Sequence, residues 1–97
     1  MPLTVLVTPS FARTAKKLRP EGKAVLDAAV QAVARDPALG AEKRGDLNGV
    51  LVYKFKLNKQ ETLLAYRLQP DKLAPEELVL LAVGPHENFY RDLKRAQ

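Results

Sequence analysis

The fold of this chain is decided by the stretch Val50-Leu-Val-Tyr-Lys-Phe-Lys-Leu57 and by Thr62-Leu-Leu-Ala-Tyr-Arg-Leu68, which follows it after a short polar break. The first run alternates at its end, with Tyr53, Phe55 and Leu57 on one face and Lys54 and Lys56 on the other. This period of two is typical of a half-buried strand. In the second run Leu64, Tyr66 and Leu68 share a face opposite Leu63, Ala65 and Arg67. With a polar turn at residues 58–61 between them, the two runs are predicted to form a β-hairpin.

The residues before the hairpin predict one strand and two helices. Leu3–Thr8 is apolar and reads as a strand, and Thr8-Pro9-Ser10-Phe11 is a helix start that offers a Ser or Thr cap. Pro20 ends that first helix, and a second is predicted over Glu21–Arg35. Its apolar stripe follows the helical repeat: Val25, Leu26, Ala29, Val30 and Val33. The polar, glycine-rich segment 38–49 is predicted to be a connecting loop.

The residues after the hairpin predict a central strand and a closing helix. Leu78–Val83 is almost purely apolar, and Gly84-Pro85 then turns the chain into a short basic helix over His86–Arg95. The resulting order is β-α-α-β-β-β-α. We therefore predict an α+β fold with a four-stranded, mostly antiparallel sheet, two N-terminal helices packed on one face and a short C-terminal helix.

Size and composition narrow the class of protein. With 97 residues, 46% hydrophobic and 28% charged, the chain is expected to be one domain over residues 1–97. It has no cysteine, which excludes disulfides and thiolate metal sites. No apolar run approaches the ~18 residues of a membrane span, and the N-terminus lacks the features of a signal peptide. The expected location is the cytoplasm, away from membranes.

The charge balance is basic, with sixteen Lys and Arg against eleven Asp and Glu. A net charge of +5 favours a polyanionic or acidic partner, although a solvated surface rich in lysine explains the same number. From residue 47 to residue 60 the only charged side chains are those of Lys54, Lys56 and Lys59.

The only histidine, His86, stands where the last strand meets the last helix. Its ordinary pKa of about 6.5 suits proton transfer, and Tyr90 follows one helical turn later. The alternative is structural: His86 at a helix start acts as a cap, and Tyr90 packs in the core. Phe89 and Leu93, four residues apart, are expected to be core residues.

The element order, the length and three short patches together resemble the RelE/ParE superfamily of toxins from bacterial type II toxin–antitoxin pairs. The patches are Lys43-Arg44-Gly45, Tyr53-Lys54-Phe55-Lys56-Leu57 and the ending Gly84-x-His86-x-x-x-Tyr90. The second resembles a strand of RelE-type ribonucleases, and the third resembles the finish of the YafQ-like branch.

The resemblance implies a RelE-like microbial-RNase-type fold and a ribosome-dependent endoribonuclease that cuts messenger RNA without a metal or other cofactor. It also implies a cognate antitoxin as partner, besides the ribosome and its messenger RNA. In this scheme His86, Tyr90 and Lys54 are the catalytic candidates. The candidates for phosphate, RNA or ribosome contacts are Lys56, Arg67, Lys43, Arg44, Arg91, Lys94 and Arg95.

Two departures from RelE keep other readings open. An arginine of the third strand is replaced by Leu63, and an arginine before the last helix is replaced by His86. The alternatives are a ParE-like toxin that inhibits DNA gyrase by binding, and a catalytically degenerate toxin that still binds its antitoxin. The sequence leaves the oligomeric state of the free chain undecided.

Overall fold

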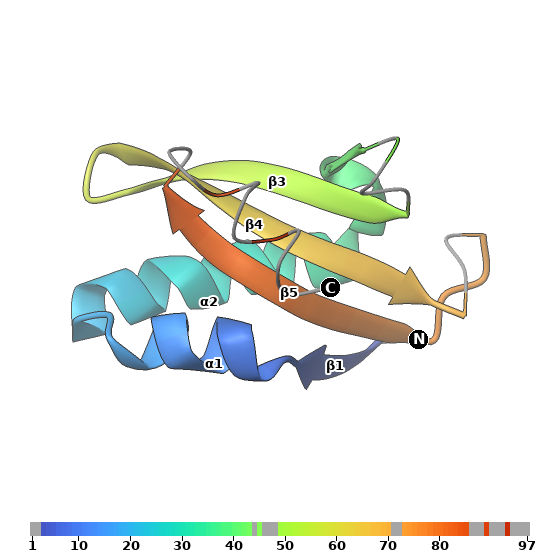
Figure 1. Cartoon of the computed structure of the whole chain (residues 1–97), viewed down its shortest axis with the longest axis horizontal. Helices are drawn as coiled ribbons and strands as arrows, with labels where there is room; N and C mark the ends of the chain where they lie inside the picture. Colours follow the sequence, from blue (N-terminus) through green and yellow to red (C-terminus); the bar gives the residue numbers. More distant parts are fainter. Residues whose placement is uncertain are drawn as a thin grey trace.

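The computed structural model describes residues 3–43, 45, 49–70, 73–85, 89 and 93. The chain begins with strand β1 (Thr4–Val7) and helices α1 (Pro9–Lys16) and α2 (Pro20–Arg35), shown in Figure 1. A 3₁₀-helix η1 (Pro37–Leu39) and four further strands follow: β2 (Ala41–Glu42), β3 (Val50–Leu57), β4 (Gln60–Gln69) and β5 (Glu77–Pro85). Within this part of the chain, no helix is both long and apolar enough to cross a membrane.

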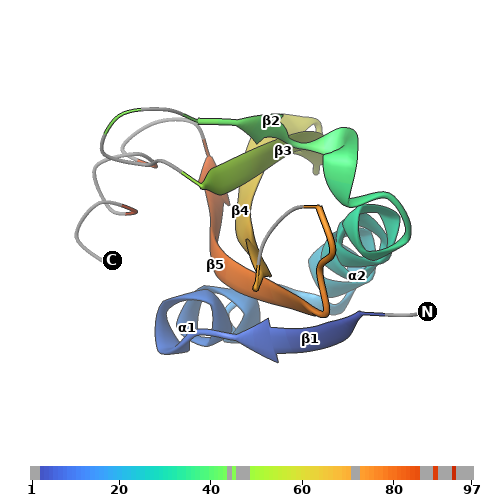
Figure 2. The ribbon, with the colours of Figure 1, turned by 90° about the vertical axis from the view of Figure 1, so that its right-hand side faces the viewer.

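The strands form one sheet in the order β1-β5-β4-β3-β2. Strand β1 runs parallel to β5, and every other neighbouring pair is antiparallel. Figure 2 shows β1 at one edge and β2 at the other. The predicted α+β class is confirmed, but the predicted count of four strands is wrong. The missed strand β2 has two residues, paired with Val52 and Leu51, and its polar surroundings hide it in the sequence.

The β3–β4 turn is tighter than predicted. Asn58 and Lys59 both have positive φ, 53° and 67°, which is the geometry of a two-residue hairpin turn that asparagine tolerates well. Gln60 and Glu61, predicted as turn residues, therefore belong to β4. Leu57 pairs with Gln60, and this contact sets the register of the whole hairpin.

Thr8 fixes the junction between β1 and α1. Its hydroxyl accepts the Phe11 backbone N–H at 3.2 Å, which caps the helix as predicted. The same hydroxyl donates to the carbonyl of Leu81 at 2.9 Å. Leu81 is the extra residue where the β4–β5 register shifts, because Ala65 pairs with Ala82 and Tyr66 pairs with Leu80. One side chain thus caps α1 and satisfies a carbonyl at the bulge.

One face of the sheet packs against α1 and α2. The buried members of this helical-face cluster are Phe11, Leu26, Ala29, Val33, Leu51, Leu64, Tyr66, Leu68, Leu78, Leu80 and Val83. Val25, predicted on the apolar stripe of α2, is exposed, and Gly22 is buried on that helix instead. Gly22 lies against Leu18 and Leu57, where an added Cβ would be in ordinary van der Waals contact at 3.6–3.8 Å.

The opposite face carries a second apolar cluster. Its buried members are Val50, Val52, Leu63, Ala65, Phe89 and Leu93. Phe89 and Leu93 are helical, and their predicted place in the core is confirmed. We call these six residues the C-terminal cluster.

Tyr66 joins the sheet to the segment before β2. Its ring is fully buried, and its hydroxyl donates to Pro37 O at 2.6 Å and accepts from the Gly40 N–H at 2.9 Å. A Cβ on Gly40 would lie 2.6 Å from that hydroxyl, so only glycine fits there. Burial raises the pKa of Tyr66 above its ordinary value of 10.0.

Replacing Tyr66 by phenylalanine tests this connection. Tyr66→Phe leaves the Pro37 carbonyl and the Gly40 N–H without a partner, so we expect the free energy of unfolding to fall by about 1–3 kcal/mol at neutral pH. Because burial raises the pKa of Tyr66, the folded state disfavours the ionised side chain. The free energy of unfolding of the wild type is therefore retained below pH 10 and falls as the pH rises above it. Denaturant unfolding at pH 7 and pH 11 measures both effects.

The matched control is Tyr53→Phe, which keeps the ring that stacks on Phe55 with centroids 6.2 Å apart. An equal loss of stability in the two variants, or an unchanged alkaline fall in Tyr66→Phe, would contradict this account of the hydroxyl.

Candidate nucleic-acid interface

The two lysines of β3 lie on the sheet face opposite α1 and α2. Lys54 and Lys56 are exposed, whereas Tyr53 and Phe55, which alternate with them along the strand, pack against the helical-face cluster. Residues two apart on a strand are separated by about 6.5 Å, close to the spacing of neighbouring phosphates along an extended nucleic-acid strand. The predicted pairing of these lysines on one face is confirmed.

The cross-strand partners of the two lysines differ in character. Lys54 is paired with Leu63, and Lys56 is paired with the carboxylate residue Glu61. Directly opposite residues project from the same face, so Glu61 and Lys56 are neighbours. This acid lowers the local positive potential at one of the two candidate phosphate contacts.

The end of β5 lies in line with the lysines. Leu63 of β4 pairs with Lys54 on one side and with Gly84 on the other, so Lys54 and Gly84 share one row across three strands. Neighbouring strands are about 4.8 Å apart, which separates the two Cα atoms by about 10 Å. The ring of Phe89 lies over Gly84, where a Cβ would be 3.9 Å from Phe89 Cδ1.

Several predicted site residues lie outside the described part of the chain. They are Arg44, His86, Tyr90, Arg91, Lys94 and Arg95. The sequence places His86 directly after Pro85, the last residue of β5, and this position in the chain is what relates it to the described site.

Arg67 and Lys43 lie at the other end of the same three strands. Arg67 is paired with Val50, and the Lys43 N–H donates to Val50 O at 2.8 Å. Arg67 is four residues along β4 from the partner of Lys54, a separation of about 13 Å. Its guanidinium lies over Gly49, where a Cβ would be 2.9 Å from Nη1. The structure therefore does not bring Arg67 beside Lys54 and Lys56.

The C-terminal cluster separates the two basic ends. Leu63 is completely buried in this cluster together with Leu93. A charged side chain there would have to lie beneath Phe89 and Leu93. The candidate site is thus a sheet face with cations at both ends and an apolar centre covered by C-terminal residues.

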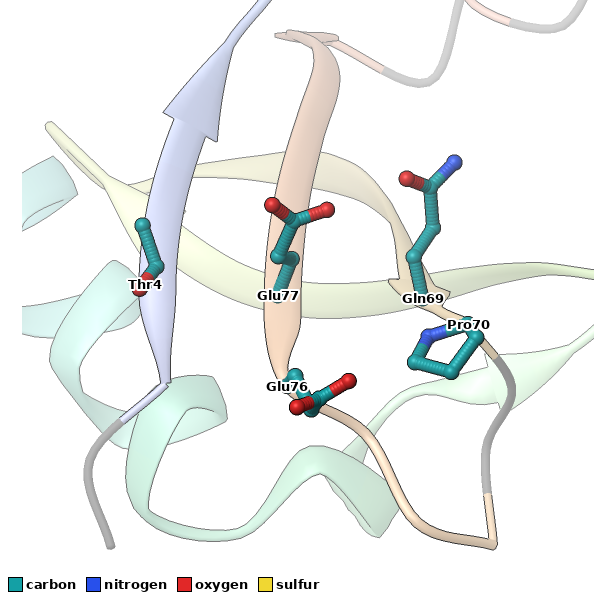
Figure 3. A pocket seen from close by; sticks show the side chains of 5 residues that line it. All are labelled: Thr4, Gln69, Pro70, Glu76 and Glu77. Atoms are coloured by element: carbon teal, nitrogen blue, oxygen red, sulfur yellow. The ribbon is translucent and has the colours of Figure 1, made fainter.

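A surface cavity elsewhere contains none of the predicted site residues. It is lined by Thr4, Gln69, Pro70, Glu76 and Glu77, as Figure 3 shows. This acidic cavity lies where β1 and β5 begin and β4 ends, at the opposite end of β4 and β5 from the turn that follows Lys56. It offers no cation to a polyanion.

A family model for the ParE-like toxin of type II bacterial toxin–antitoxin systems matches residues 5–94. The chain belongs to this family. The match covers every strand and helix described above except Thr4, the first residue of β1, and it confirms the predicted RelE/ParE superfamily. The protein is thus the toxin of a type II toxin–antitoxin pair.

Solved toxin structures share the fold. A chain of the RelBE2 toxin–antitoxin complex of Mycobacterium tuberculosis is 25% identical, with 89% of this chain and 100% of that chain covered and a TM-score of 0.62. A mutant of the E. coli toxin RelE in the free state is 19% identical over 98% and 97% of the chains, with a TM-score of 0.69. The intact E. coli RelBE complex matches at 19% identity over 88% and 98%, with a TM-score of 0.62. Curated protein sequences include no match to this ParE-like toxin.

Two features of the site were missed in the sequence. Glu61 was assigned to the turn, although an Asn-Lys pair able to form a two-residue turn places it opposite Lys56. The apolar centre was also missed, although Val50 and Val52 precede Lys54 on the same face and have to be covered. Both features can be read from the sequence when the register of the hairpin is known.

Truncating Leu93 tests whether the C-terminal residues are part of the core. Leu93→Ala removes a completely buried side chain from the C-terminal cluster, so we expect a loss of about 2–5 kcal/mol in the free energy of unfolding. Urea denaturation measures it, with the exposed Leu73→Ala as the matched control. A loss below about 1 kcal/mol would show that the cluster does not need this residue.

Neutralising Glu61 tests the local balance of charge at the lysines. Glu61→Gln is expected to strengthen binding of a short single-stranded oligonucleotide about twofold to fivefold, as measured by fluorescence anisotropy. Glu21→Gln, in the first turn of α2, changes the net charge equally and is the control. Equal gains in both variants would mean that only net charge matters.

Proposed function

We propose that this ParE-like toxin is a ribosome-dependent, metal-independent endoribonuclease that cuts messenger RNA in the cytoplasm. The observation that carries the proposal is the row shared by Lys54 and Gly84. Because of it, β5 ends beside an exposed pair of lysines, one residue before the only histidine of the chain.

The reaction needs three kinds of group. The ribose 2′-oxygen attacks the adjacent phosphorus, the bond to the 5′-oxygen breaks, and the products are a 2′,3′-cyclic phosphate and a 5′-hydroxyl. A base takes the proton of the 2′-hydroxyl, an acid gives a proton to the 5′-oxygen, and cations stabilise the charge of the phosphorane.

This chain supplies candidates for each role. Lys54 and Lys56 stabilise the phosphorane, since both are exposed on the open face. His86 acts in proton transfer because its ordinary pKa is near the working pH, and Tyr90 is the second donor or a stacking surface for a base. With a single imidazole, a mechanism that uses two histidines is excluded. Arg67 and Lys43 contact the RNA backbone farther along.

Gyrase inhibition without cleavage is the second candidate function. The observation that favours it is the buried Leu63, because the centre of the site has a leucine where RelE carries arginine. A toxin that acts by binding alone needs no acid–base group near the lysines. In that case His86 serves as a helix cap.

The test is a cell-free translation reaction with mapping of messenger RNA 5′ ends. New ends inside codons are expected with the wild type, and His86→Ala is expected to lower the cleavage rate about 100-fold to 10,000-fold. Lys54→Ala is expected to lower it as well, whereas Lys59→Ala removes an exposed turn lysine outside the site and is the matched control.

Other outcomes would contradict the nuclease proposal or change the roles of its residues. Translation that stops without new 5′ ends would overturn the nuclease proposal. Loss of DNA supercoiling in a gyrase assay would then establish the second function. Cleavage that survives His86→Ala but not Lys54→Ala would assign proton transfer to other groups.

A further inference from the structure

Among the described residues, the outer edge of β1 lacks the usual protection of an edge strand. In the described residues β1 pairs with β5 alone, and all four of its residues are exposed. Three of them are large aliphatic residues: Val5 is 42% exposed, Leu6 41% and Val7 55%. Edge strands that stay unpaired commonly carry charges, proline or a bulge within the strand, and β1 has none of these.

The backbone of β1 is arranged to accept another strand. The Thr4 N–H donates to Glu76 O and the Thr8 N–H donates to Leu80 O, so alternate residues direct their amides toward β5. Val5 and Val7 therefore direct their backbone N–H and C=O groups toward the free edge. Such groups are a template for strand addition.

Opposite charges lie near the two ends of β1. Where β1 begins, Glu76 and Glu77 line the cavity of Figure 3 beside Thr4. Where β1 ends, α1 follows in line with the strand (Figure 1), and residues 3–20 hold four exposed cations and no acid. The cations are Arg13, Lys16, Lys17 and Arg19.

We propose that a second copy of this chain pairs with β1, antiparallel and about a two-fold axis at Leu6. Val5 of each copy then exchanges both backbone hydrogen bonds with Val7 of the other, which joins the two sheets into one. An antiparallel partner reverses the order of charges, so the basic α1 of each copy extends toward Glu76 and Glu77 of the other. This contact is self-complementary, as a two-fold interface has to be.

The charges favour a second copy over a purely acidic partner. An acidic peptide along this edge would match α1 but would place like charges beside Glu76 and Glu77. A second copy places opposite charges near each other at both ends of β1. The proposal goes beyond the nuclease proposal and does not depend on it, because association is measured without RNA.

Sedimentation equilibrium of the full chain, from micromolar to near-millimolar concentration, tests the proposal. The mass is expected to rise from 10.8 kDa toward twice that value, and added salt is expected to weaken association. Val7→Lys places a cation opposite the second copy and is expected to weaken the dimer about tenfold or more. Val25→Lys changes an exposed valine on α2 and is the matched control.

A charge exchange tests the register. Glu76→Arg is expected to weaken the dimer, and addition of Arg13→Glu is expected to restore it, with circular dichroism confirming that each variant folds. A single-chain mass at every concentration, or a dimer indifferent to Val7→Lys, would overturn the proposal. It would also be overturned if the chain stays monomeric and the Val5 and Val7 amides become protected from exchange only when antitoxin is added.

Discussion

The structure depends on the burial of β4 on both of its faces. Leu63, Leu64, Ala65 and Tyr66 follow one another along the strand, and none of them has any exposed surface. Successive side chains of a strand point to opposite faces, so a layer is required on each side of the sheet. Helices α1 and α2 supply one layer, and Phe89 with Leu93 supplies part of the other. Phe89 and Leu93 therefore cover this face of the sheet, and the same C-terminal stretch of sequence contains the only histidine.

This double role shapes the candidate site. The cover occupies the centre of the sheet face, so the described cations stand at its two ends, with Lys54 and Lys56 at one end and Arg67 at the other. The apolar Leu63 suits the cover because a buried, unpaired cation at its position would be costly. A polyanion that binds this face therefore meets two separate groups of cations among the described residues.

The sequence predicts the fold well where periodicity is strong. The alternation in residues 50–57 and the apolar run ending at Val83 identified the central strands, and the second helix was placed to within one residue of α2. The predicted closing helix over His86–Arg95 lies mostly outside the described residues. Prediction from the sequence fails where pairing rather than pattern creates structure, as in β2, whose two residues become a strand only through their bonds to β3. At the site, the pairing of Lys54 and Lys56 on one face follows from alternation alone. The neighbour Glu61 does not, because it depends on the left-handed turn at Asn58 and Lys59.

The parallel pairing of β1 with β5 has a consequence for the order of events during synthesis. Val5 pairs with Leu78, seventy-three positions later in the chain, and β1 has no other partner strand within the described structure. Contacts of such long sequence separation form late and slow folding, because a long loop has to be closed first. The first strand to be synthesised is thus among the last to pair with its neighbour. A chain interrupted before β5 lacks both the partner of β1 and the C-terminal cover. An unfinished copy of this toxin cannot complete its sheet.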